Sequence, residues 1–178
     1  MRALVVYESL FGNTEQVARA VAEGIGLGSR GAMSVEVADV AGAPAVLDDD
    51  LDLVVVGGPT HAFSMSRPST REDAVRQGGR ATAARSGIRE WLGDLRSGPH
   101  SQRLAVFDTR VGKVRHLPGS AAKSAARALH KLGYTTAFRP ESFYVEDVSG
   151  PLLDGELVRA HVWGSELAVE VCDRVRHT

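Results

Sequence analysis

The chain has 178 residues, of which 43% are hydrophobic, a composition that fits one domain with a sizeable core. No apolar run approaches the roughly 18 to 20 residues that a membrane-spanning helix requires. The formal net charge of −1 predicts no binding to nucleic acid or membranes, and the only cysteine, Cys172, excludes an internal disulfide. We therefore expect a soluble, cytoplasmic protein with a single domain over residues 1–178.

The first informative stretch joins a strand to a helix. Residues 4–7 are apolar and predict a strand, and the apolar residues of 17–25 recur at helical spacing. The loop over residues 9–14 lies between them. Because the first backbone N–H groups of a helix have no internal partner and carry partial positive charge, such a junction predicts an anion site.

The side chains of this loop support the same interpretation. Ser9 and Thr14 add hydroxyl groups, Gly12 permits a close backbone approach, and Asn13 is expected to cap the helix. The loop holds no Lys or Arg, which distinguishes it from a Walker-type loop.

Two other patterns imitate binding motifs. Residues 26–31 match Gly-x-Gly-x-x-Gly, but they follow a helix and precede a predicted strand at 34–38, so we interpret these glycines as the stop of the helix. The acidic residues 48–50 and 52 precede the apolar strand 53–56. They lie opposite the edge where open α/β sheets bind ligands, and a solvated acidic loop explains them better than a metal site.

Two further strands end in polar segments. The strand 53–56 leads into Gly57-Gly58-Pro59-Thr60-His61-Ala62-Phe63, and the strand 104–107 leads into Asp108, Thr109 and a third loop at 111–119. Because parallel strands present their carboxyl ends at one edge, we expect these segments to converge with the first loop.

Residues 64–86 are polar and turn-rich and predict a long Arg-rich insertion without regular structure. A helix follows at 88–95, with Trp91 on its apolar face. The last strand is expected at 143–146, and a final helix from about residue 154. Strands that alternate with helices predict one parallel sheet covered on both faces.

The pattern Ser-x-x-Gly-Asn-Thr at residues 9–14 resembles the phosphate loop of flavodoxins, and Gly-Gly-Pro-Thr-His at 57–61 closely resembles their quinone-reductase relatives. The C-terminal segment is similar to the last helix of these proteins, so the resemblance runs from Arg2 to about Val175. It implies an α/β fold with a doubly wound, five-stranded parallel sheet of order 2-1-3-4-5. The ligand would lie at the switch point between the first and third strands.

The resemblance also implies flavin mononucleotide (FMN) as cofactor. The residues that it assigns to the cofactor are Ser9, Leu10, Phe11, Gly12, Asn13, Thr14, Pro59, Thr60, His61, Ala62, Phe63, Asp108, Thr109 and Arg110. In flavodoxins the third loop commonly supplies a Tyr that covers the outer flavin face, and this chain has none there. That face would be open, covered by His116, or covered by a partner subunit in a homodimer.

Three functions are compatible with this resemblance. One is a flavin-dependent reductase or oxidase of a quinone-like or other small acceptor, as in quinone reductases and menaquinone-dependent protoporphyrinogen oxidases. The second is an electron carrier to a redox partner protein, and the third is a flavin-free interaction domain. No nucleic-acid partner is expected.

Cations of the second and third loops favour the enzyme. Arg67, Arg71, Arg110, Lys113 and Arg115 predict a cationic rim that would stabilise a reduced flavin anion, by about 1 kcal/mol per close pair in water. The alternative is that these arginines only solvate a long loop.

Overall fold

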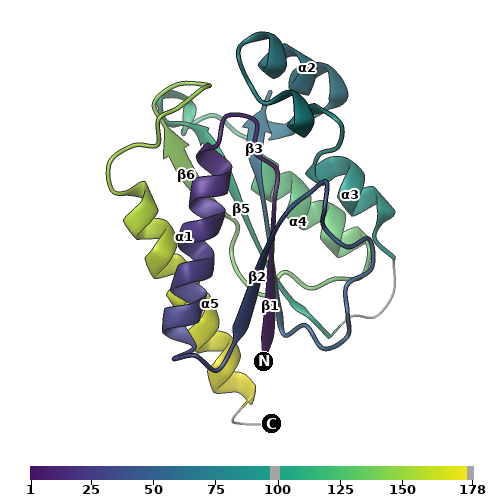
Figure 1. The fold of residues 1–178 in the computed structure, drawn as a ribbon, viewed down its shortest axis with the longest axis vertical. Helices are drawn as coiled ribbons and strands as arrows, with labels where there is room; N and C mark the ends of the chain where they lie inside the picture. Colours follow the sequence, from purple (N-terminus) through teal and green to yellow (C-terminus); the bar gives the residue numbers. More distant parts are fainter. Residues whose placement is uncertain (97–100, 176–178) are drawn as a thin grey trace.

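Five parallel strands form the centre of the molecule (Figure 1). The computed structural model describes residues 1–96 and 101–175. The parallel strands are β1 (Arg2–Tyr7), β2 (Ser34–Asp39), β3 (Leu53–His61), β5 (Arg103–Val111) and β6 (Glu141–Val145). Their order is β2-β1-β3-β5-β6, which confirms the predicted order 2-1-3-4-5. The two-residue strand β4 (Ser64–Met65), which was not predicted, pairs antiparallel with the end of β3.

Helices cover both faces of the sheet, as predicted (Figure 1). One face carries α1 (Asn13–Gly28) and α5 (Glu156–Val175), and the other carries α3 (Ile88–Asp94) and α4 (Ala121–Lys131). The remaining helix α2 (Pro68–Arg76) and the short 3-10 turns η1 (Ala81–Ala84) and η2 (Gly112–Val114) lie outside these two layers. Successive side chains of a strand point to opposite faces. In β1, Leu4 and Val6 pack with the core under α3 and α4, whereas Ala3 and Val5 pack under α1 and α5.

Strand β3 is longer than the sequence indicates, because it continues through the predicted loop to His61. At Gly57 the ring of Phe107 occupies the place of a side chain, with a ring carbon 2.0 Å from an ideal Cβ position. The chain then reverses at Ala62 and Phe63, both with positive φ, of 46° and 64°. The predicted loop 57–63 is therefore mostly strand, followed by a tight turn.

Strand β5 also continues beyond its predicted end. Asp108, Thr109 and Arg110 belong to the strand and not to the third loop, since β3 and β6 supply backbone partners on its two sides. All three side chains are buried.

The segment 64–86 is not the irregular loop that the sequence predicts. It folds into β4, α2 and η1, and α2 lies beyond the carboxyl ends of the strands (Figure 1). Arg71 of α2 is only 1% exposed, so this residue does not belong to an exposed cationic rim.

Glycines bring α1 and α5 close together. An ideal Cβ on Gly164 would lie 2.2 Å from the carbonyl oxygen of Val21, and one on Gly24 would lie 2.0 Å from the carbonyl oxygen of His161. Gly28 is similarly close to Ser165. Helix α1 ends at Gly28, within the predicted segment 26–31, and Gly24 and Gly28 have the further role of letting α1 approach α5.

We expect Gly164→Ala to lower the free energy of unfolding by about 1 to 3 kcal/mol, because the added methyl group overpacks the contact with Val21. Gly26→Ala is the matched control, because nothing lies within 4 Å of its Cβ position. That variant should be more stable by about 0.5 to 1 kcal/mol, as for Gly to Ala within a helix. Urea denaturation measures both, and equal effects would contradict the packing role.

Candidate functional site

A cavity of about 250 Å³ lies at the carboxyl edge of the sheet. It is lined by the loop after β1, by the ends of β3, β5 and β6, and by α2. The predicted residues that line it are Leu10, Phe11, Asn13, Thr14, Pro59, Thr60, His61, Ala62, Thr109 and Arg110. The structure thus brings the three predicted segments together. Sequence reasoning missed the wall from α2, formed by Thr70, Asp73, Ala74 and Gln77, because that segment was expected to be a loop.

The loop between β1 and α1 is organised around Ser9 and Gly12. Gly12 has a φ of 90°, a conformation that favours glycine, and it is the N-cap residue of α1. The Ser9 hydroxyl oxygen accepts hydrogen bonds from the backbone N–H groups of Gly12 (3.1 Å) and Glu15 (3.2 Å). The expectation that the Asn13 side chain caps the helix is wrong. Its side-chain amide instead donates to the Ser149 carbonyl oxygen.

Several backbone N–H groups of this loop remain available. Within residues 1–96 and 101–175, those of Leu10, Phe11, Asn13 and Thr14 donate to no other protein atom. Together with the helix dipole, they form a cradle for an anion beside the cavity.

A cation from a distant segment accompanies this cradle. A guanidinium nitrogen of Arg80 lies 3.3 Å from an ideal Cβ position on Gly12, and the Arg80 backbone N–H donates to the Leu10 carbonyl oxygen (2.8 Å). Arg80 also pairs with Glu15 at 2.6 Å, and this hydrogen bond lowers the pKa of Glu15. The local sequence of the loop gave no sign of this positive charge.

Thr109 and Arg110 bring β5 into contact with the site. The hydroxyl oxygens of Thr14 and Thr109 are 2.7 Å apart and share a hydrogen bond. Arg110 is 6% exposed, and one terminal nitrogen donates to the carbonyl oxygens of Val114 (2.9 Å) and Leu117 (3.2 Å). Its Nε is buried and has no partner among the described residues, an arrangement that a ligand acceptor in the cavity would complete.

Of the predicted cofactor residues, Ser9, Gly12, Phe63 and Asp108 do not line the cavity. Phe63 is 48% exposed and does not line the cavity. The Asp108 carboxylate is buried and accepts from the Ala122 backbone N–H (2.9 Å), at the start of α4. His61 does line the cavity, and burial lowers the pKa of its imidazole, which is therefore neutral at pH 7.

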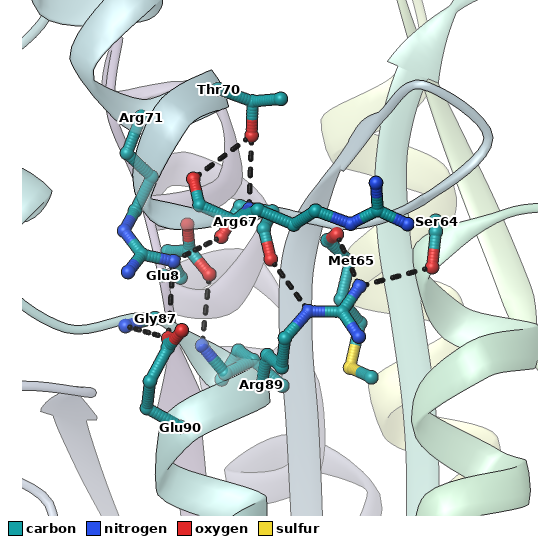
Figure 2. Close-up of polar contacts among 11 residues, drawn as sticks. Glu8, Ser64, Met65, Arg67, Thr70, Arg71, Gly87, Arg89 and Glu90 are labelled. Atoms are coloured by element: carbon teal, nitrogen blue, oxygen red, sulfur yellow. Dashed lines mark hydrogen bonds and ion pairs between the residues drawn. The ribbon is translucent and has the colours of Figure 1, made fainter.

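Behind the α2 wall lies an ionic cluster, defined by the buried residues Glu8, Ser66 and Arg71 and the half-buried Glu90; Figure 2 shows its contacts. Arg71 donates to the Ser66 hydroxyl (2.9 Å) and pairs with Glu90 (3.0 Å). Glu8, directly after β1, accepts from the Ile88 backbone N–H (2.9 Å). The cluster therefore joins α2, α3 and the end of β1.

Arg89 extends these contacts to β4 (Figure 2). Its guanidinium donates to the carbonyl oxygens of Met65 (2.8 Å) and Ser66 (2.9 Å). The orientation of α2, and with it one wall of the cavity, thus depends on charged side chains away from the cavity.

The titration of Glu8 gives a test of this cluster. Burial raises the pKa of Glu8 above its ordinary value of 4.5. A raised pKa in the folded state means that this group's contribution to stability is complete below the ordinary pKa and is lost as the pH rises through the folded-state pKa.

We expect Glu8→Gln, which keeps an acceptor for Ile88, to gain stability relative to the natural protein as the pH rises above the ordinary pKa of Glu8, by up to about 1.4 kcal/mol per pH unit. Urea unfolding at several pH values measures the difference. Glu72→Gln on the exposed side of α2 is the control and should follow the natural protein. A Glu8→Gln difference that is constant with pH would contradict the titration.

Comparisons with known proteins agree with this architecture. No family model and no curated protein matches the sequence. Among solved structures, a flavodoxin from the domain Archaea has 19% identity and a TM-score of 0.62, with 96% of this chain and 99% of that chain covered. A Streptococcus pneumonia TIGR4 flavodoxin has 16% identity and a TM-score of 0.62, with the same coverage. A WrbA-like flavodoxin from Agrobacterium tumefaciens has 17% identity and a TM-score of 0.55, with 97% of this chain and 98% of that chain covered. No helix of the described residues is long and apolar enough to span a membrane.

The similarity to these solved structures over nearly the whole chain shows that the protein has the flavodoxin-like fold.

Proposed function

We propose that the chain binds FMN in this cavity and acts as an FMN-dependent reductase or oxidase on a quinone-like or other small acceptor. The observation that supports it most directly is the anion cradle at the start of α1, which opens beside the cavity at the switch point of the sheet. Its unpaired N–H groups suit a buried phosphate that carries no metal.

The residues present fit this cofactor. The backbone N–H groups of the cradle and the Thr14 hydroxyl would hold the phosphate, and the end of β3 from Pro59 to Ala62 would border the ring. The buried Nε of Arg110 would donate to a polar edge of the ring. Bound FMN supplies electron transfer in one- or two-electron steps.

Arg110 favours the enzyme over the carrier. It is a buried cation in the cavity wall, and only neutral carbonyl oxygens accept its hydrogen bonds among the described residues. Negative charge that develops on a neighbouring ligand is stabilised more strongly there than at an exposed site. Arg71 contributes nothing of this kind to the cavity, since it belongs to the ionic cluster behind α2.

An electron carrier to a protein partner is the second candidate, favoured by the exposed turn at Ala62 and Phe63 beside the cavity. Quinone reduction by the FMN-loaded protein with a nicotinamide donor separates the two. Rapid multiple turnover supports the enzyme, and its absence with retained FMN supports the carrier.

We expect the protein to bind FMN more tightly than riboflavin, because only FMN brings the phosphate. Thr14→Ala should weaken FMN binding by roughly 1 to 3 kcal/mol, as for a lost bond to a charged group, and leave riboflavin binding almost unchanged. Fluorescence titration measures both. Thr109→Val is the matched control, since it removes the same Thr14–Thr109 bond but keeps the Thr14 hydroxyl. Equal affinity of the natural protein for the two flavins would refute phosphate binding.

We expect Arg110→Gln to lower the two-electron potential of bound FMN, because the variant loses a buried positive charge beside the ring. Each tenfold change in the equilibrium constant corresponds to about 30 mV. Arg115→Gln, which removes an exposed cation five positions on, is the control and should change the potential much less because solvent screens its charge. A redox titration measures the shifts. Equal shifts in both variants would contradict a special role for Arg110.

A further inference from the structure

Charge is distributed unevenly along this nearly neutral chain. Residues 109–140 contain no Asp or Glu, although the whole chain has a formal charge of −1. The cations of this segment are Arg110, Lys113, Arg115, Lys123, Arg127, Lys131 and Arg139. The segment comprises the end of β5, the turn η2 and helix α4, and it begins at the cavity wall.

Four cations of this segment are exposed and form no ion pair among the described residues, although Lys113 and Arg115 line a depression that also holds Glu146. Lys113, Arg115, Lys123 and Arg127 are all exposed. Among the ion pairs within residues 1–96 and 101–175, none involves any of these four. Other exposed arginines of the molecule, such as Arg19, are paired with a neighbouring carboxylate.

Apolar side chains are exposed between these cations. Phe63 is 48% exposed, Leu117 46% and Val114 37%. Arg110 donates hydrogen bonds to the carbonyl oxygens of both Val114 and Leu117. Phe63 lies against Gly119, because an ideal Cβ on Gly119 would be 2.7 Å from the Phe63 carbonyl oxygen. The three exposed apolar residues thus belong to two segments in contact, the turn after β3 and the loop after β5, beside Ala62 and Arg110 of the cavity wall.

Helix α4 places further positive charge beside these apolar residues. The Ser64 hydroxyl donates to the Ser124 hydroxyl (3.1 Å), which fixes the turn after β3 against the first part of α4. Lys123 is adjacent to Ser124, and Arg127 donates to the same hydroxyl (3.4 Å). An apolar centre with a charged rim is the usual composition of a protein–protein interface.

We propose that this surface, formed by Phe63, Val114 and Leu117 with the surrounding cations, is the docking site of an acidic protein that covers the mouth of the cavity. The apolar centre favours a protein over nucleic acid, whose backbone would use the cations and leave the apolar residues exposed. The cavity wall next to this surface is formed by His61, Ala62 and Arg110, so a docked partner would lie close to any ligand in the cavity. The inference does not require that the cavity bind a flavin.

The test uses the full chain as purified, with a plant-type [2Fe–2S] ferredoxin as an acidic protein probe, in calorimetric titrations at low and at physiological salt. The docking variant is Lys113→Glu with Arg115→Glu. The control is Arg30→Glu with Arg174→Glu, which changes the net charge equally at exposed positions away from the cavity. A third variant, Phe63→Ser, tests the apolar centre.

We expect saturable binding that weakens with salt, an about tenfold larger Kd for the docking variant, a weaker effect of Phe63→Ser, and little change in the control. Equal losses in docking variant and control would overturn the proposal, because net charge alone would then explain binding. Absence of binding at low salt, or tighter binding of duplex DNA to the same surface, would also overturn it. FMN content, measured separately in every variant, keeps a failure of flavin binding distinct from a failure of docking.

Discussion

The architecture of the cavity depends on one buried positive charge. Arg71 lies inside the protein at 1% exposure, where an unpaired guanidinium would cost several kcal/mol. Its position is tolerated because α3 brings Glu90, with which Arg71 pairs at 3.0 Å, and because the Ser66 hydroxyl accepts a hydrogen bond from Arg71 at 2.9 Å. Removal of Glu90 would weaken the compensation of this buried charge, so the pair couples helix α2, which forms one wall of the cavity, to α3.

The two arginines nearest to the candidate site have different roles, although they look alike in sequence. Arg110 lines the cavity, donates to backbone carbonyl oxygens and has a buried Nε without a partner among the described residues, whereas the exposed Arg80 lies beside Gly12 and pairs with Glu15. A buried cation acts strongly on a single neighbour, but an exposed one is screened by water and salt. The predicted cationic rim is thus divided among the ionic cluster, a cavity wall and an exposed surface.

Much of the fold could be predicted because its determinants are local. Apolar strands alternate with helical periodicity, and the loop at 9–14 combines a positive-φ glycine with hydroxyl groups in six consecutive residues. What was missed depends on partners distant in sequence. In the extension of β3 the ring of Phe107 fills the space at Gly57, and the buried Arg71 pairs with Glu90 of α3. The approach of Arg80 to Gly12 is likewise invisible before the chain is folded.

The glycine contact between α1 and α5 has a consequence for the order of folding. Val21 and Gly164 meet only when the strands between them in sequence have already been arranged, so the pair is a contact of high sequence separation. Such contacts form late, because the entropy of closing a long loop is lost before the contact stabilises the chain. Closure of the contact between α1 and α5 is therefore expected to add to the entropic barrier to folding.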